Sequence, residues 1–219
     1  MAREYYGPEN VDKVFLCDGD AIVMRQAHLL QILEALYAAF PHLRQVTVYA
    51  GTRSTMTKSQ EQLIELRQAG LTRAYLGVES GWDELLKNAG IDLWVTVILG
   101  LAGPGEPSKK HVEETIRVLN RMQANHVSCL SYMPEPNSPM YQDVKEGRFQ
   151  MITPREYLEE TRALVAGLNY GPFHFTSNHA SNYLPLKGTL PDDREKFLSM
   201  IDNALGGKQR IRSEYSRAL

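Results

Sequence analysis

Cysteine is scarce in this sequence: only Cys17 and Cys129 occur among 219 residues, and each lies in an apolar run. Two thiolates cannot complete a four-sulfur metal site or hold an iron–sulfur cluster unaided. Long apolar runs are also absent, since the longest, residues 93–102, falls well short of the roughly 20 residues that span a bilayer. We therefore expect two buried, reduced thiols in a protein without a membrane span.

An excess of charge of either sign is lacking as well. The chain has 24 lysines and arginines against 26 aspartates and glutamates, a net charge of -2. This balance gives no general attraction to nucleic acid or to anionic membranes. No basic segment followed by an apolar one opens the chain, so nothing indicates export and a cytoplasmic location is expected. The length suffices for one sizeable core.

Short apolar runs alternate with stretches of helical periodicity, as in α/β proteins with a parallel sheet. Thr57–Gln60 and Thr153–Glu156 both have the form of a capping box, which predicts a helix start. The charged tail after Gly206 and Gly207 is expected to be loosely held. The expected strands are residues 14–17, 46–50, 74–78, 95–99, 127–132 and, less regular, 172–176, and the expected helices are residues 29–40, 57–70, 108–122, 153–168 and 191–205.

The spacing of these strands contains one irregularity. Strand starts at residues 14, 46, 74, 95 and 127 are separated by 32, 28, 21 and 32 residues. A complete βαβ unit usually needs about 30 residues. We therefore expect that Lys87 and Asn88 join segments that a longer protein would separate; the alternative is one short helix of about two turns.

Polar residues and glycines follow several of these strands. Asp18-Gly19-Asp20 follows the first strand, Glu79-Ser80 lies within Gly77–Gly81 after the third, and residues 100–106 follow the fourth. Parallel strands place such residues at one edge of the sheet, where ligands bind. Each segment also has a structural explanation: a polar turn for the first, and a helix N-terminus capped by Ser80 for the second.

With these motifs in order, the chain resembles the radical S-adenosylmethionine (radical SAM) family over most of residues 1–142, from the end of that family's first helix onward. The resemblance implies a partial (β/α)6 TIM-like barrel whose first β/α unit is missing. It also implies S-adenosylmethionine and a [4Fe–4S] cluster as cofactors of the full-length protein. Residues 143–219 are then a C-terminal extension of helix, irregular strand and helix.

The resemblance assigns cofactor contacts residue by residue. Asp18, Gly19 and Asp20 stand where the family's Gly-Gly-Glu receives the methionine amino group, although the acid is shorter. Glu79 and Ser80 resemble the ribose-binding residues. Ile98 and Gly100 resemble the adenine-contacting strand, although Thr96 and Gly103 depart from its pattern.

Two further segments complete the resemblance. Tyr132 and Met133 match a site of main-chain contacts to adenine, and residues 134–141 resemble the family's P-x-P-G-T-P-x-Y loop. If the assignments hold, Asp20, Glu79 and Gly100 converge on one hollow. The alternative for Ile98 and Gly100 is a buried strand that ends in a glycine loop.

The family's C-x3-C-x2-C loop is missing, and Cys17 cannot replace three thiolates. Residues 2–6 have the pattern of a last helical turn, so the chain is expected to be truncated before that loop and unable to hold the cluster. The family would also imply an electron donor such as flavodoxin or ferredoxin, whereas the substrate and the catalytic residues stay open.

Outside the shared barrel, residues 174–183 are rich in polar side chains, and His174, Asn178 and His179 are candidates for substrate contact. The simpler explanation is a hydrogen-bonded surface loop. Arg53 follows the second strand and either pairs with a carboxylate of cofactor or substrate or is an exposed loop arginine.

Three functions follow in order of preference. The first is the core of a radical SAM enzyme that generates a 5′-deoxyadenosyl radical, inactive as this fragment. The second is a non-catalytic degenerate barrel that binds a nucleotide-like ligand or a partner protein. The third is a metal-dependent hydrolase that uses His174, His179 and the pair Asp18 and Asp20.

Overall fold

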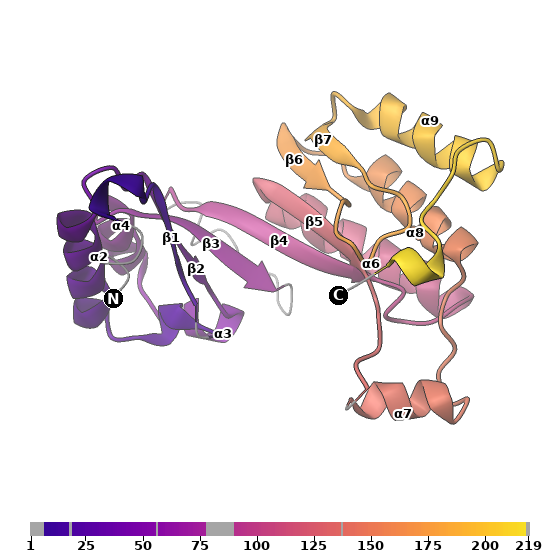
Figure 1. Cartoon of the computed structure of the whole chain (residues 1–219), viewed down its shortest axis with the longest axis horizontal. Helices are drawn as coiled ribbons and strands as arrows, with labels where there is room; N and C mark the ends of the chain where they lie inside the picture. Colours follow the sequence, from indigo (N-terminus) through magenta and orange to yellow (C-terminus); the bar gives the residue numbers. More distant parts are fainter. Residues whose placement is uncertain (1–6, 18, 56, 78–89, 137, 218–219) are drawn as a thin grey trace. The chain divides into compact units, whose positions relative to one another are not determined.

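The computed structural model describes residues 7–17, 19–55, 57–77, 90–136 and 138–217 (Figure 1). The chain forms two compact units, residues 1–95 and 96–219, each described by itself below. The boundary lies within strand β4, Asp92–Leu99. The expected boundary between barrel core and extension, at residues 142 and 143, stays a prediction.

The fold is α/β, and its seven strands follow chain order from β1 to β7. The pairs β1–β2, β2–β3 and β5–β6 are parallel, whereas β6 and β7 are antiparallel. The predicted α/β class with a parallel sheet is therefore confirmed, except that the last pair, β6 and β7, is antiparallel. No helix in the described ranges combines the length and the apolar composition that a membrane crossing requires.

Unit 1 packs helices against the buried side of its strands (Figure 1). Val46 and Val48 of β2 and Leu33 and Leu63 of the helices are at most 1% exposed. Alternation along a strand sends the intervening side chains to the opposite face of the sheet. The elements are η1 (Pro8–Asn10), β1 (Lys13–Leu16), η2 (Ala21–Val23), α2 (Gln26–Ala39), β2 (Gln45–Tyr49), α3 (Thr52–Thr55), α4 (Gln60–Gln68), β3 (Leu71–Gly77) and the start of β4.

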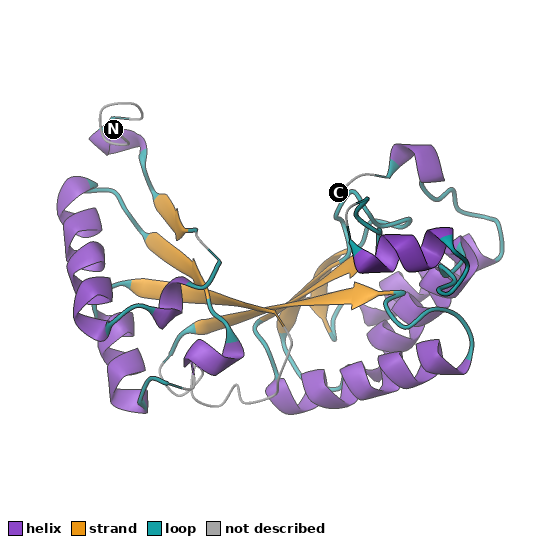
Figure 2. Ribbon diagram, turned by 90° about the horizontal axis from the view of Figure 1, so that it is seen from below, coloured by secondary structure: helices purple, strands orange, loops and turns teal. Residues whose placement is uncertain are grey.

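Unit 2 has the same α/β construction, with helices beside its strands (Figure 2). Cys129 of β5, Leu119 of α6 and Tyr157 of α8 are fully buried. The elements are the end of β4, α6 (Glu106–Met122), β5 (His126–Ser131), α7 (Pro139–Lys145), α8 (Pro154–Gly167), β6 (Phe173–Thr176), β7 (Lys187–Leu190), α9 (Arg194–Leu205) and η3 (Glu214–Ser216).

One of the two predicted capping boxes lies elsewhere. The box at Thr153 and Glu156 is confirmed. The first box is formed by Ser59 and Gln62, not by Thr57, whose hydroxyl donates to the Ser54 carbonyl at 2.7 Å. The spacing Ser/Thr-x-x-Gln occurs twice in this segment, and the chain turns before the second copy.

Three further expectations in unit 2 were wrong or incomplete. The proline-rich segment is not all loop, because Ser138 caps α7, which begins at Pro139. Strand β7 was missed, since only its last residue, Leu190, is buried. The tail is not loosely held, because Arg217 is 8% exposed and forms several hydrogen bonds.

Candidate functional site

In unit 1 the candidate site begins with Asp20, which follows β1. One carboxylate oxygen accepts the Gly51 N–H at 2.9 Å, and the other accepts the Ser54 hydroxyl. Asp20 therefore ties the segment after β1 to the segment after β2. A carboxylate has about four acceptor positions, so two such bonds leave capacity for a further donor such as an ammonium group.

A buried lysine strengthens the same connection. Lys58 is 7% exposed and donates to the Met24 carbonyl at 2.9 Å. Burial lowers the pKa of its ammonium group. No pattern in the sequence indicates this role, since a lysine at a helix start normally lies in solvent.

The other predicted residues of unit 1 are placed only in part. Gly19 is exposed and has φ +74°, a conformation that glycine adopts readily. Arg53 lies in α3, in the turn after β2. Asp18, Glu79 and Ser80, together with the expected junction at Lys87 and Asn88 and the expected helical turn at residues 2–6, lie outside the described residues.

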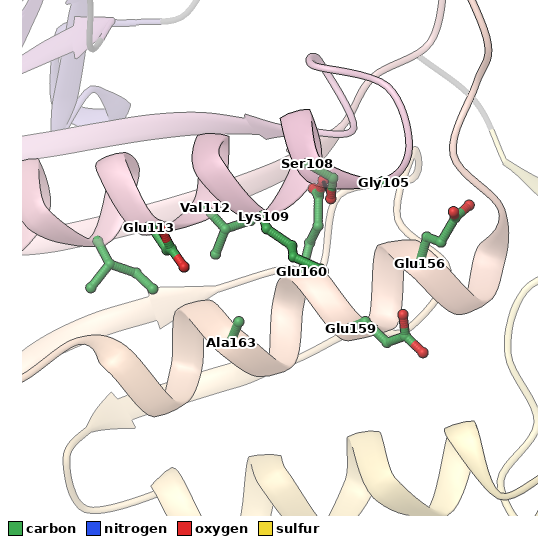
Figure 3. Close-up of a pocket in the computed structure, with 10 residues that line it drawn as sticks. Gly105, Ser108, Lys109, Val112, Glu113, Glu156, Glu159, Glu160 and Ala163 are labelled. Atoms are coloured by element: carbon green, nitrogen blue, oxygen red, sulfur yellow. Dashed lines mark hydrogen bonds between the residues drawn. The ribbon is translucent and has the colours of Figure 1, made fainter.

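In unit 2 the candidate site is built around Gly100, which directly follows β4. Its N–H donates to Oε2 of Glu160 at 2.8 Å, and the Ser108 hydroxyl donates to Oε1 of the same carboxylate at 2.5 Å. Figure 3 shows Glu160 extending from α8 toward Ser108 at the start of α6. Because Glu160 is only 3% exposed, this connection is shielded from water and fixes the turn after β4.

The glycine itself is required by packing. Gly100 is buried with φ +80°, and a Cβ at this position would lie 2.8 Å from Cδ1 of Ile152. Ile98, two residues earlier, is 39% exposed, and Leu101 is 41% exposed. The end of β4 and the turn after it thus present two exposed apolar side chains, Ile98 and Leu101.

The segment after β5 is held against the same turn. The Tyr132 N–H donates to the Leu99 carbonyl at 2.8 Å, and the Tyr132 ring meets Phe149 edge-on at 6.1 Å. Burial, with a smaller contribution from Asp143, raises the pKa of Tyr132. Tyr132 and Met133 are both half-buried, so part of each side chain stays accessible.

The bonds of Glu160 to Gly100 and Ser108 are here called the latch, and a hollow of about 330 Å³ lies beside it between α6 and α8. Val112, Ile116 and Ala163 give it apolar walls, and Glu113 and Glu159 add carboxylates. Figure 3 shows the Glu159 carboxylate directed away from Glu160.

The polar segment after β6 bonds mainly to its own unit. His179 Nδ1 lies 2.9 Å from the Ser181 hydroxyl, which accepts the Ser131 N–H at 3.2 Å. Asn182 donates to the Cys129 carbonyl at 2.7 Å. Ser181 and Asn182 are fully buried, so these bonds close the carboxyl end of β5.

The remaining polar candidates of this segment are exposed. Asn178 is an exposed side chain, and His174 lies on β6 with its ring 5.9 Å from that of His126. Within the described residues no three His, Cys, Asp or Glu side chains form a group that could hold a metal ion.

Arg217 is a site residue that sequence reasoning missed. Its guanidinium donates to the Ser131 hydroxyl at 2.9 Å and to the Ser181 carbonyl at 2.6 Å, and it lies 4.0 Å from the centre of the Tyr183 ring. Glu214 pairs with the same group. The only signal in the sequence was an arginine in a charged tail, which by itself indicates a solvated side chain.

The cysteines do not fit an iron–sulfur cluster. Cys129 is fully buried, as expected, and burial raises the pKa of its thiol; the expectation of a buried Cys17 is wrong, because Cys17 is exposed directly after β1. A cluster ligand must be a thiolate, and cluster sites use several of them. The chain's own residues therefore supply no cluster site, and no step through a cluster follows from them.

Comparison with known proteins finds no matching family profile. The heme chaperone HemW of Bacillus subtilis is 22% identical over 179 residues, which cover 73% of this chain and 46% of that protein. The chain thus spans about half the length of this curated relative.

Two solved structures share the fold. The Elp3 protein of Methanocaldococcus infernus, with an N-terminal deletion, superposes with a TM-score of 0.55 at 16% identity and covers 95% of this chain and 57% of that one. HydG, a maturase of the [FeFe]-hydrogenase, gives a TM-score of 0.52 at 13% identity and covers 90% of this chain and 46% of that one. The chain is therefore related to the radical SAM superfamily and has the α/β fold of its partial barrels.

Proposed function

We propose that the chain forms the S-adenosylmethionine-binding part of a radical SAM enzyme. The observation that carries the proposal lies at the end of β4, where exposed Ile98 stands two residues before Gly100, whose N–H is held by Glu160. An accessible apolar side chain at a fixed strand end suits a flat adenine ring, because little conformational freedom is lost on binding. Asp20 of unit 1 has remaining acceptor positions, and its role toward the methionine ammonium group stays a prediction.

The proposal restricts what this chain does alone. Because its two cysteines do not fit a cluster, it is expected to bind the adenosyl ligand without cleaving it. Radical chemistry, and an electron donor such as flavodoxin or ferredoxin, would belong to a protein that contains the cluster ligands. That Asp20, Glu79 and Gly100 face one hollow stays a prediction.

Calorimetric titration with S-adenosylhomocysteine tests the proposal. This ligand keeps the adenosyl and amino-acid groups of S-adenosylmethionine but lacks its sulfonium centre, so its binding can be measured without cleavage and without a cluster. We expect saturable binding of one molecule per chain, and we expect Ile98→Asp to weaken it about tenfold or more, since a charge would face the apolar ring. Tyr215→Asp is the control, because Tyr215 is fully exposed in the tail.

Two results would contradict the proposal. One is the absence of saturable heat with the parent chain. The other is equal affinity in the Ile98 and Tyr215 variants.

The second candidate function, a non-catalytic binding barrel, is favoured by the poor fit of Cys17 and Cys129 to a cluster. It predicts a full-length sequence that also lacks the three-cysteine loop, which sequencing of the complete gene decides.

A further inference from the structure

Unit 1 carries a row of aromatic side chains across four strands, here called the aromatic row: Phe15, Tyr49, Tyr75 and Trp94. Ring centres lie 4.7 Å apart for Phe15 and Tyr49, 6.2 Å for Tyr49 and Tyr75, and 5.0 Å for Tyr75 and Trp94. The row is thus continuous from β1 to β4.

The row lies on the sheet face opposite the helices. Val48, Ala74 and Leu93, each adjacent in sequence to a member of the row, are completely buried. Successive side chains of a strand point to opposite faces, so the row occupies the other face. Phe15, Tyr75 and Trp94 are half-buried, and Tyr49 is 47% exposed.

The row has unused hydrogen-bonding groups. Among the described residues, the hydroxyls of Tyr49 and Tyr75 have no hydrogen-bond partner, although both rings are held by their neighbours. A tyrosine with a fixed ring and a free hydroxyl suits a ligand with a flat apolar face and polar edge atoms.

Charge limits the class of ligand. Arg73 lies 5.0 Å from the centre of the Trp94 ring, and its guanidinium is 3.6 Å from the carboxylate of Asp92. This cation is therefore already paired with a carboxylate. Nucleic-acid strands that stack on aromatic sheets also need cations along their phosphates, which favours an uncharged ligand here.

The size of the row fits the same conclusion. Neighbouring strands lie about 4.8 Å apart, so four strands span roughly 14 Å. We infer that the aromatic row binds a flat, uncharged, conjugated ring system through stacking and edge hydrogen bonds. This inference rests on the proposed function in one respect, that the bound ring system is the enzyme's substrate.

Fluorescence titration with lumichrome, an uncharged tricyclic heteroaromatic compound, tests the inference. The chain has two tryptophans, so Trp82→Phe leaves Trp94 in the row as the reporter. We expect saturable quenching, weakened about tenfold by Tyr49→Leu, which removes the most exposed ring. Tyr49→Phe keeps the ring and should retain affinity within about threefold, a smaller loss from one neutral hydrogen bond.

Tyr215→Leu is the matched control, because it removes an aromatic side chain that is fully exposed outside the row. Circular dichroism checks that each variant is folded. Quenching that does not saturate, or equal affinity for Tyr49→Leu and Tyr215→Leu, would overturn the inference. Tighter binding of a ten-residue oligothymidylate than of lumichrome would overturn it in favour of nucleic acid.

Titration of the same variants with S-adenosylhomocysteine separates this inference from the proposed function. Tyr49→Leu should leave that affinity unchanged. Loss of both ligands in Tyr49→Leu would overturn a separate role of the row. Lumichrome binding without any binding of S-adenosylhomocysteine would support the row as a ligand site and contradict the proposed function alone.

Discussion

The strand ends of the two units differ in what satisfies their polar groups. In unit 2, Arg217, Ser181 and Asn182 bond to the end of β5 and fill it with the chain's own side chains. In unit 1, Asp20 keeps acceptor capacity, and the hydroxyls of Tyr49 and Tyr75 have no described partner. Polar residues at strand ends therefore indicate a ligand only where the fold has not already paired them.

Among the variants that test this contrast, Arg217→Ala should have the largest effect on stability. Arg217 is buried against Ser131, Ser181 and Tyr183, and its removal leaves their polar groups without a donor. A buried acceptor left without its donor costs about 1 to 3 kcal/mol, so the loss of the bonds to Ser131 and Ser181 should cost about 3 to 5 kcal/mol. The free energy of unfolding of unit 2, measured by hydrogen exchange in β5 as a function of urea, should fall by that amount.

Arg210→Ala is the control for this variant, since Arg210 is an exposed arginine of the same tail. Its effect should stay within about 0.5 kcal/mol. Equal stability of the two variants would show that the tail does not hold unit 2 together, and the contrast between the units would fail.

The second largest loss of stability is expected for Glu160→Ala. This change removes the acceptor of two buried donors, the Gly100 N–H and the Ser108 hydroxyl, and should lower the free energy of unfolding by about 3 kcal/mol. Glu159→Ala, one residue earlier on α8, breaks only an exposed pair with Arg155 and should cost less than about 1 kcal/mol. Urea unfolding of the two variants gives the comparison, and a smaller loss for the Glu160 variant would refute the latch.

The pH dependence of stability above pH 10 tests how well unit 2 buries the hydroxyl of Tyr183. Burial, followed by the hydrogen bond to Glu214, raises the pKa of Tyr183 to about 12 from 10.0. Between those pH values the folded chain keeps a proton that the unfolded chain has lost, so the free energy of unfolding falls as pH rises. The loss should reach about 2 to 3 kcal/mol by pH 12.

Tyr183→Phe removes this ionisation. The difference in unfolding free energy between parent and variant should therefore shrink from pH 10 to pH 12, as measured by urea unfolding at each pH. A constant difference would contradict the assigned pKa of Tyr183.

The smallest effect is expected in unit 1, for Asp20→Ala. Its carboxylate accepts from Gly51 and Ser54 at a half-buried position, so the loss should be about 1 kcal/mol. Asp12→Ala, with an exposed side chain, should change stability by less than about 0.5 kcal/mol. If Asp20 also accepts a ligand ammonium group, Asp20→Ala should lower the affinity for S-adenosylhomocysteine. If the free energy of unfolding instead falls by more than about 3 kcal/mol, Asp20 is a purely structural residue.

Sequence predictions succeeded where the pattern lies within one short segment and failed where the structure depends on a distant segment. The strands at residues 46–50 and 127–132 were found within one or two residues, because alternating burial and apolar runs are local. The capping box at Thr153 was found for the same reason. Strand β7 has little apolar pattern of its own and is specified by pairing with β6, as in Phe173 opposite Leu190.

The sequence by itself determined the α/β class, most of the elements in their order and the resemblance that the comparisons bear out. Only the tertiary structure decided which polar groups are already paired: Glu160 meets Gly100 across 60 positions and Arg217 meets Ser131 across 86. A periodic pattern reports on its own segment, because it reflects backbone geometry over a few residues. A hydrogen bond between distant segments depends on where the whole chain brings them, and no single residue type encodes that partner.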